Sequence, residues 1–307
     1  MAFWTVAQQV LVLFLLVAVG YAGGKAKWFG QGAVRGCTEL VLLFATPCVI
    51  IQSFQKPFDA SMLAGLGAAV LIALGVHAAT IVIARLVFRD KDEARRRVLR
   101  FGTVFSNAGY MSLPLQQALL GEEGVFYGAA YVAVFNLILW SYGVLEMSGD
   151  RKSLSVKKLL LNPGLIGLAC GLPVFLLSIQ LPEVIAAPVR HLAALNTPLP
   201  MIIVGACLAE TRLTAIWKDA RCYLAAGLRL LVIPLATLAV LLLCGVRGAL
   251  LTACVIAASA PCAAATTMFA TRYHQDTHLS VNLVSMTTLL SVVTMPLVVG
   301  LSRTLGG

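Results

Sequence analysis

Residues 106–114 read SNAGYMSLP, a polar stretch that interrupts an otherwise apolar segment. Inside a bilayer no water satisfies the backbone, so irregular chain survives only where it lines a protein-buried or water-filled cavity. Pro114 removes a backbone N–H group and clashes with the preceding turn, while Gly109 permits dihedral angles that other residues avoid. Three side chains supply donors and acceptors at this point: Ser106, Asn107 and Ser112. The stretch predicts either a kink or a break that forms part of a binding site.

The composition is that of a polytopic membrane protein. Of the 307 residues, 60% are hydrophobic and only 12% are charged, which is too little charge to cover a soluble domain of this length. Apolar stretches of about 20 residues, the length that crosses a bilayer, recur along the whole chain. No basic residues precede the first apolar stretch, and Lys25 and Lys27 follow it. We therefore expect a retained first span rather than a cleaved signal peptide.

The apolar pattern predicts ten transmembrane spans. They cover about 3–22, 38–55, 62–87, 101–120, 124–147, 162–181, 192–210, 221–244, 248–271 and 278–302. Loops after odd-numbered spans carry 18 Lys and Arg residues, mostly within 85–100, 151–158 and 212–221, against four on the opposite side. By the positive-inside rule, these loops are cytoplasmic and both termini lie outside, in the inner (plasma) membrane of the cell.

The two halves of the chain share the positions of their helix breakers. Thr46-Pro47 in the second span has a counterpart in Thr197-Pro198 in the seventh, and Pro114 in the fourth span has one in Pro261 in the ninth. Residues 1–150 and 151–307 therefore look like two copies of one five-helix unit. Because five is odd, the copies must be inverted relative to each other in the membrane, which is typical of secondary transporters.

The paired breaks favour discontinuous helices that cross at the midplane over two unrelated kinks. In the ninth span the break lies in ASAPCAAATTM at 258–268. The N-termini of half-helices carry partial positive charge and free N–H groups, which suit an anionic group of a substrate. We expect the binding site to be built from Ser106, Asn107, Gly109, Ser112, Pro114, Ser259, Pro261, Thr266 and Thr267.

Four stretches resemble sequences of the auxin efflux carrier family, which includes the plant PIN auxin exporters and bacterial carriers linked to malate and malonate. They are FSNAGYMSLPL at 105–115, NPGLIGLACGLPVFLL at 162–177, GACLAE at 205–210 and MTTLLSVVTMPLVVGL at 286–301. The resemblance runs over the whole chain. It implies an all-α polytopic fold of ten helices in two inverted five-helix repeats, with crossing broken helices 4 and 9. That fold is similar to the fold of the bile-acid sodium symporters.

The same resemblance implies two domains with different roles. Helices 1, 2, 6 and 7 form a scaffold domain, and helices 3–5 and 8–10 form a transport domain that moves like an elevator. A homodimer is a further expectation. By position, Asn107 matches the asparagine that contacts the substrate carboxylate in the plant exporters, and Asn136 matches a polar contact on their fifth helix. The long cytoplasmic loop of the plant exporters is reduced here to SGDRKSLSVKK at 148–158.

Arg229 and His77 lie in the interior of predicted spans, where charge is expensive and often functional, whereas Glu39, Glu146 and Glu210 lie at span ends. Arg229 either pairs with a structural carboxylate such as Glu210, or snorkels or supplies the positive charge that attracts an anion; a structural or coupling role is favoured. His77 either shuttles protons or packs against a neighbouring helix, and packing is favoured. No span contains an aspartate or a carboxylate cluster that resembles a sodium cage, although carbonyls and hydroxyls alone can hold sodium.

These features predict a secondary active transporter, or a potential-driven exporter, of a small organic anion. A carboxylate such as malate, malonate or an auxin-like aromatic acid is expected. The alternatives are a sodium-coupled symporter of the bile-acid type, a channel, or a membrane sensor that does not transport. An enzyme is not expected, because no span carries a nucleophile–base pair, facing carboxylates or a His-rich metal site.

Nucleic acid and cofactors are not expected partners either. The net charge of +10 comes from short loops without interleaved aromatic residues, so the predicted partners are the anion and the lipid bilayer. The eight cysteines show no CxxC pair or His-containing cluster. We interpret them as small buried hydrophobic residues rather than metal ligands or disulfides.

Overall fold

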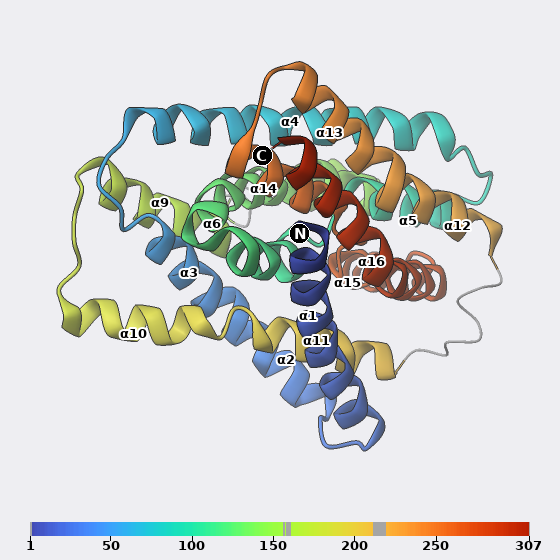
Figure 1. Ribbon diagram of the computed structural model, residues 1–307. Coiled ribbons are helices and arrows are strands. Elements are labelled where there is room, and N and C mark those ends of the chain that lie inside the picture. The colour runs from blue at the N-terminus through green and yellow to red at the C-terminus, as the bar shows by residue number, and fades with distance from the viewer. Residues whose placement is uncertain (1, 156, 158–160, 211–218, 307) are drawn as a thin grey trace.

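The computed structural model describes residues 2–155, 157, 161–210 and 219–306, and this part of the chain is almost entirely helical. In Figure 1, α4 and α13 lie at the top of the view, α12 lies at the right, and α2, α3, α10 and α11 lie in the lower part, with α6 and α14 between them. Of the basic residues that predict the orientation, Lys158, Arg212 and Lys218 lie outside the described part.

Helices follow one another with short connections in both halves of the chain. The first half contains α1 (Ala2–Lys25), α2 (Gln31–Leu40), α3 (Thr46–Ser53), α4 (Ala60–Val87), α5 (Glu93–Val104), α6 (Leu113–Ile138) and α7 (Val144–Ser148). The second half contains α9 (Pro163–Leu176), α10 (Glu183–Ala194), α11 (Pro198–Ala209), α12 (Ala220–Gly227), α13 (Ile233–Leu243), α14 (Gly248–Ser259), α15 (Ala265–Arg272) and α16 (Thr277–Gly306). A 3₁₀ turn, η4, covers Arg151–Ser153.

Seven helical segments in the described ranges are long and apolar enough to cross a membrane. They are Val6–Lys25, Gly32–Ser53, Ala60–Val87, Ala108–Ser148, Glu183–Ala209, Ala220–Leu243 and Thr277–Gly306. Two shorter apolar helices, Pro163–Leu176 and Gly248–Ser259, accompany them. The long segment Ala108–Ser148 is not straight, because Gly121 has φ 64° and ψ −148°, angles that only glycine adopts readily. This turn lies between the predicted fourth and fifth spans.

Three predicted boundaries were wrong. The fourth span was predicted to begin at residue 101, but its helix, α5, begins at Glu93. Two other starts differ as well. The seventh span was predicted to begin at residue 192, but its helix begins at Glu183, directly after Pro182. The second span was predicted to begin at residue 38, but its helix begins at Gln31. In both cases the added turns are polar enough to resemble a loop in the sequence. A helix needs only one apolar face, so tertiary packing can extend it beyond its apolar core.

Proline residues produce π-helical turns at three places. The turns η1 (Val41–Ala45), η2 (Ala108–Ser112) and η6 (Leu228–Val232) each precede an X–Pro pair that opens the next helix. Proline donates no N–H to the preceding turn and clashes with its carbonyl group, so a widened turn relieves the contact. A fourth π-turn, η3 (Leu139–Gly143), has no such proline. Among these turns, η2 carries the polar break and η6 carries Arg229.

We describe the helices as two groups, which also pack against each other through α1 and α16 and through α3, α9 and α6. In one group α1 packs on α11, and α3 packs on α9 and α10. In the other, α6 packs on α4 and α14, and α14 packs on α13 and α16. The first group is tightly packed: a Cβ atom on Gly205 would lie 2.0 Å from the carbonyl oxygen of Val17, and one on Gly20 would lie 2.1 Å from that of Ile202. Small residues thus let the backbones of α1 and α11 touch, as is common between membrane helices.

The Thr-Pro pairs of the two halves also lie close together. The hydroxyl of Thr46 donates to Asn196 Oδ1 at 3.1 Å, and both residues are buried. Asn196 directly precedes Thr197-Pro198, so the matching breakers of the second and seventh predicted spans contact each other. A buried hydrogen bond of this kind fixes the relative position of α3 and α11.

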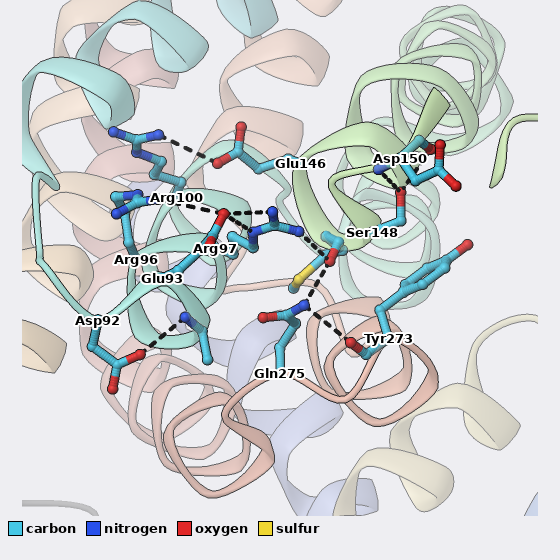
Figure 2. Close-up of polar contacts among 12 residues, drawn as sticks. Asp92, Glu93, Arg96, Arg97, Arg100, Glu146, Ser148, Asp150, Tyr273 and Gln275 are labelled. Atoms are coloured by element: carbon cyan, nitrogen blue, oxygen red, sulfur yellow. Dashed lines mark hydrogen bonds and ion pairs between the residues drawn. The ribbon is translucent and has the colours of Figure 1, made fainter. Parts of the chain in front are cut away.

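A cluster of arginines on α5 connects the second group at one end. Arg97 donates to the carbonyl oxygen of Met147 at 3.0 Å, and Gln275 donates to the same oxygen at 2.9 Å. Figure 2 shows Arg97 held by Glu93 on one side and directed toward the end of α7 on the other. Lys and Arg side chains often satisfy the last carbonyls of a helix in this way. Segments from both halves of the chain therefore meet at α5.

Two further arginines extend this cluster. Arg95 binds Asp219 at 2.6 Å and approaches Asp276 at 3.8 Å, so it joins α5 to the starts of α12 and α16. Arg100 approaches Glu146 at 3.5 Å, and the side chain of Glu146 is only 8% exposed. Because these positive charges already have partners within the protein, the cluster acts as a structural connection.

We predict that the contact between α1 and α11 does not tolerate a methyl group. Gly205→Ala should lower the midpoint of thermal unfolding by several degrees, because overpacking of a filled site costs about 1–3 kcal/mol. Intrinsic fluorescence of the detergent-purified protein measures this. The matched control is Gly67→Ala in α4, where no atom lies within 4 Å of the added Cβ. An equal loss of stability in both variants would contradict the prediction.

We also predict that the Arg95–Asp219 pair stabilises the protein in a pH-dependent way. Burial favours a higher pKa for Asp219, but hydrogen bonds from Arg95 and from the backbone of Arg221 and Cys222 outweigh it and hold the pKa below its ordinary value. Asp219→Asn keeps the oxygen that accepts from the Arg221 N–H and removes the charge together with the second oxygen, which accepts from Arg95. The loss should be about 1 kcal/mol at pH 7.

A carboxylate whose pKa is lowered by folding contributes its stability above its unfolded pKa, about 3.9 for aspartate. The difference between wild type and Asp219→Asn should therefore persist at pH 5–7. It should vanish as the pH falls through the lowered pKa. Glu39→Gln is the control, since the Arg35–Glu39 pair is 82% and 58% exposed and should contribute little. A pH-independent difference would refute the electrostatic explanation.

Candidate functional site

The two predicted breaks meet in the interior of the protein. After α5 ends at Val104 and α14 ends at Ser259, both chains become extended, and Ser106 forms an antiparallel β-bridge with Cys262. The N–H of Asn107 donates to the Pro261 carbonyl at 2.7 Å, and the N–H of Ala263 donates to the Phe105 carbonyl at 2.9 Å. Each break thus satisfies backbone groups of the other in the interior of the protein.

Cys262 and Thr287 support this bridge, and the sequence did not identify either. The backbone N–H of Cys262 donates to Thr287 Oγ1 of α16 at 3.2 Å. The thiol of Cys262 donates to the Gly102 carbonyl of α5 at 3.0 Å. One signal was available, because Cys262 directly follows the breaking proline and Thr287 belongs to a Thr-Thr pair inside an apolar helix. Hydroxyls at such positions satisfy backbone groups that a break exposes.

Asn107 lies at the start of the second half of the broken helix. Its Oδ1 atom accepts a hydrogen bond from the backbone N–H of Tyr110 at 3.3 Å, so Asn107 caps η2. The residue is 6% exposed. Within the described chain its Nδ2 amide group has no hydrogen-bond partner, which leaves two N–H donors beside the positive end of a helix. This arrangement has the chemistry to bind a carboxylate.

Buried polar atoms without partners concentrate around the same break. Within the described ranges they include Thr103 Oγ1, Ser106 Oγ, Tyr110 Oη, Ser112 Oγ, Gln116 Oε1 and Thr266 Oγ1. Buried polar groups in folded proteins are almost always hydrogen-bonded, so each exception needs a partner such as water or a ligand. The gathering of these atoms near the bridge therefore marks a polar site rather than a simple kink.

The other predicted site residues lie at or next to the two breaks. Ser259 donates to Ile256 within α14 at 3.0 Å, and Pro261 contributes its carbonyl to the bridge. Thr267 is only half-buried, and the position where Gly109 would carry a Cβ atom has open space around it. Pro114 begins α6 directly after the π-turn. These residues shape the break more than they present binding groups.

Asn136 is not joined to the bridge by any hydrogen bond between described residues. Its amide group donates to Val132 at 2.9 Å within α6. Its Nδ2 atom would lie 2.7 Å from a Cβ atom on Gly164, at the start of α9. Asn136 therefore lies where the second group of helices meets the first.

Arg229 does not pair with Glu210, and that alternative was wrong. Its guanidinium group donates to the carbonyls of Thr103, Val104 and Ala258, and the residue is 1% exposed. Glu210 is exposed and lies beside Arg35 and Thr38. Burial also excludes the alternative in which Arg229 snorkels to the interface. The sequence missed these partners because any residue can offer a carbonyl.

His77 packs among aromatic rings. Its ring centroid lies 5.5 Å from that of Tyr131, 6.1 Å from Phe135 and 6.3 Å from Phe105. Its Nδ1 atom bonds with the Ala73 carbonyl at 2.7 Å, while Nε2 has no partner in the described part. This environment supports the packing role that the sequence favoured.

None of the eight cysteines forms a disulfide, and only three are buried. Cys222, Cys254 and Cys262 lie inside the protein, whereas Cys170, Cys207 and Cys244 are exposed on the helical surface. The interpretation of all eight as buried hydrophobic residues was therefore only partly right. Among described residues, no group of three or more His, Cys, Asp or Glu side chains has the arrangement to hold a metal ion.

Comparison with known proteins agrees with this architecture. Residues 5–299 match a family described as "Membrane transport protein", to which the auxin efflux carriers belong. The chain belongs to this family. It is also 27% identical to an uncharacterised transporter of Methanothermobacter thermautotrophicus over 305 residues, which cover 97% of this chain and 98% of that relative. Family and relative both indicate a multi-pass membrane transporter rather than an enzyme.

We predict that the carrier depends on Thr287 to hold its bridge. Thr287→Val leaves the buried N–H of Cys262 without an acceptor, which costs about 1–3 kcal/mol. The loss is measured by thermal unfolding in detergent. Thr288→Val is a closely matched control, because Thr288 is also buried in α16 and donates only to Val284 of its own helix. A larger loss for the control would contradict the assigned role.

Proposed function

We propose that this protein is a secondary active transporter, or a potential-driven exporter, of a small organic anion with a carboxylate group. The observation that carries the proposal is the buried bridge between Ser106 and Cys262, which holds Asn107 at a helix start with free amide donors. Irregular backbone at membrane depth is expected where a substrate site lies. Malate, malonate and auxin-like aromatic acids remain the expected substrates.

In this proposal the chain crosses the membrane ten times, as two inverted repeats over 1–150 and 151–307. The seven long helices and the two shorter ones supply these spans if Ala108–Ser148 is divided at Gly121. The clustering of basic loops then puts the loops in the cytoplasm and both termini outside the plasma membrane.

The two packed groups of helices correspond to the proposed domains. The scaffold consists of α1, α2, α3, α9, α10 and α11. The transport body consists of α4–α7 and α12–α16 and contains the bridge. Contacts within each group support this division. A homodimer through the scaffold is part of the proposal.

The contact of the transport body with α1 and α11 is apolar and suits sliding, whereas α3 also donates a hydrogen bond from Gln52 to Glu122 of α6. A single cluster of buried side chains joins α1 and α11 to η2, α6, α14 and α16, and it includes Met111, Met201 and Met295. Methionine is flexible and polarisable, so it adapts to a changing partner surface. Elevator-like movement of the transport body along this surface would expose the site first to one side and then to the other.

The proposed site takes the carboxylate with the Nδ2 group of Asn107 and the N–H groups at the start of η2. Ser106, Ser112 and Thr266 add hydroxyls whose oxygens have no partner in the described chain. The remaining proposed members are Gly109, Pro114, Asn136, Ser259, Pro261 and Thr267. Outward flow of a monoanion would gain about 2.3 kcal/mol from a 100 mV potential that is negative inside.

We predict that Asn107→Asp abolishes carboxylate binding without unfolding the protein. Aspartate keeps the capping oxygen that accepts from Tyr110, but it loses the amide donors and adds a negative charge. Asn107→Ser also caps and should weaken binding by at least about tenfold, the value of one charge-assisted hydrogen bond. Thermal-shift titration with malate, malonate and indole-3-acetate measures both effects, with and without sodium and at two pH values.

Flux distinguishes the remaining alternatives. Proteoliposomes that contain only this chain should show saturable, competitor-sensitive uptake of the carboxylate that gives the thermal shift. Binding without flux would indicate a sensor, a nonsaturating current would indicate a channel, and a strict sodium requirement would indicate a symporter. Wild-type affinity in Asn107→Asp would show that the site lies elsewhere.

A further inference from the structure

Arg229 is a charged side chain that the proposed binding site does not use. It lies in the π-turn η6, which precedes the Ile233-Pro234 pair, and it is 1% exposed. A lone cation in an apolar interior is expensive, and one that persists is normally paired or functional. The partners of Arg229 therefore decide what its charge does.

Those partners are neutral. The guanidinium group donates to Thr103 and Val104 at the end of α5 and to Ala258 at the end of α14, and its Nε atom has no partner. Within the described ranges, no ion pair joins it to a carboxylate. One arginine thus binds the C-terminal ends of both helices that lead into the bridge.

The neighbouring titratable side chains do not neutralise this charge. They are Tyr131, Cys262 and His77. A phenol and a thiol are uncharged at neutral pH in their ordinary state, and an imidazole is either neutral or positive. The guanidinium itself keeps its proton at any physiological pH. The net charge at the crossing point is therefore one positive unit.

Helix dipoles do not change the net charge at the crossing point. The ends of α5 and α14 carry partial negative charges that attract the guanidinium group. Each negative end belongs to a helix whose positive end moves with it, so a rigid helix contributes no net charge. Arg229 holds the two ends in place and also leaves its full unit of charge on the body that contains them.

We infer that Arg229 gives the crossing point of the empty transport body one uncompensated positive charge, which a bound monocarboxylate neutralises. This rests on the proposed function, because it needs a body that moves across the membrane. The loaded step then carries no net charge, and the return of the empty body is the step that the membrane potential drives. An inside-negative potential pulls the empty, positive body back toward the cytoplasm, which favours export of the anion.

The test needs no substrate. Purified protein is reconstituted into planar bilayers in chloride buffer without carboxylates, and voltage steps are applied. Wild type should show a transient charge movement that saturates with voltage and is equal in size on return. Its voltage dependence should correspond to no more than about one elementary charge per carrier, since one charge crosses part or all of the field.

Variants assign the charge to its residue. Arg229→Lys keeps a positive charge and should retain the movement, and Arg229→Gln should lose at least nine-tenths of it. Arg95→Gln removes an arginine from the charged cluster at the start of α5, away from the bridge, and should retain the movement. Size-exclusion profiles and thermal unfolding show which variants are folded.

Several results would overturn the inference. They are an absent transient in wild type, a voltage dependence equivalent to two or more charges, and an unchanged transient in folded Arg229→Gln. The wild-type measurement decides the matter even if Arg229→Gln does not fold. Uptake in proteoliposomes remains an independent test of the proposed function, because saturable flux without a charge transient would reject only the role of Arg229.

Discussion

Backbone groups that leave a helix inside a membrane must find partners within the protein, and the arrangement of this molecule follows from that constraint. The broken segments around Ser106 and Cys262 meet this demand by bonding to each other. The last carbonyls of α5 and α14 meet it through Arg229. Because each unsatisfied group would cost several kcal/mol in lipid, neither break is stable without the other. Two distant parts of the sequence are therefore obliged to lie side by side.

The π-turns show how the same constraint is met where the chain does not break. Before Pro47 and before Pro234 the helix widens by one residue and continues, so the lost hydrogen bond has only a local effect. Before Pro114 the widened turn follows directly on the extended residues 105–107, and the helix starts anew with its own cap. The difference lies in the flanking residues, since Asn107 supplies a capping oxygen that neither of the other two turns has. Proline alone bends the chain, and a capping residue converts the bend into a helix start.

These local features explain what the sequence could predict. A proline that breaks a helix affects only the few residues next to it. The breaks at Pro114 and Pro261, and the corresponding positions of the two Thr-Pro sites, could therefore be read from the sequence. The partners of Arg229 were not visible, because every residue has a carbonyl and only the packing of α5 and α14 decides which ones point inward. Asn136 illustrates the same limit: a position along the helix did not reveal that the side chain lies against Gly164. The seventh span was predicted to begin too late because the turns after Glu183 are amphipathic. Their polar residues lower the mean hydropathy by which apolar spans are recognised.

The distribution of polar contacts bears on the proposed movement. Bonds that join the two halves of the chain are concentrated within the transport body: the bridge, the contacts of Arg229, the ion pair of Arg95 with Asp219, and the bond from Gln275 to Met147. Directional bonds of this kind resist sliding, because displacement by one or two ångströms breaks them. The surface between this body and α1 and α11 is instead made of apolar side chains, whose contacts are non-directional and can be exchanged for similar ones. A body held together by directional bonds on a non-directional surface can move as a unit, and the bridge would travel with its geometry intact.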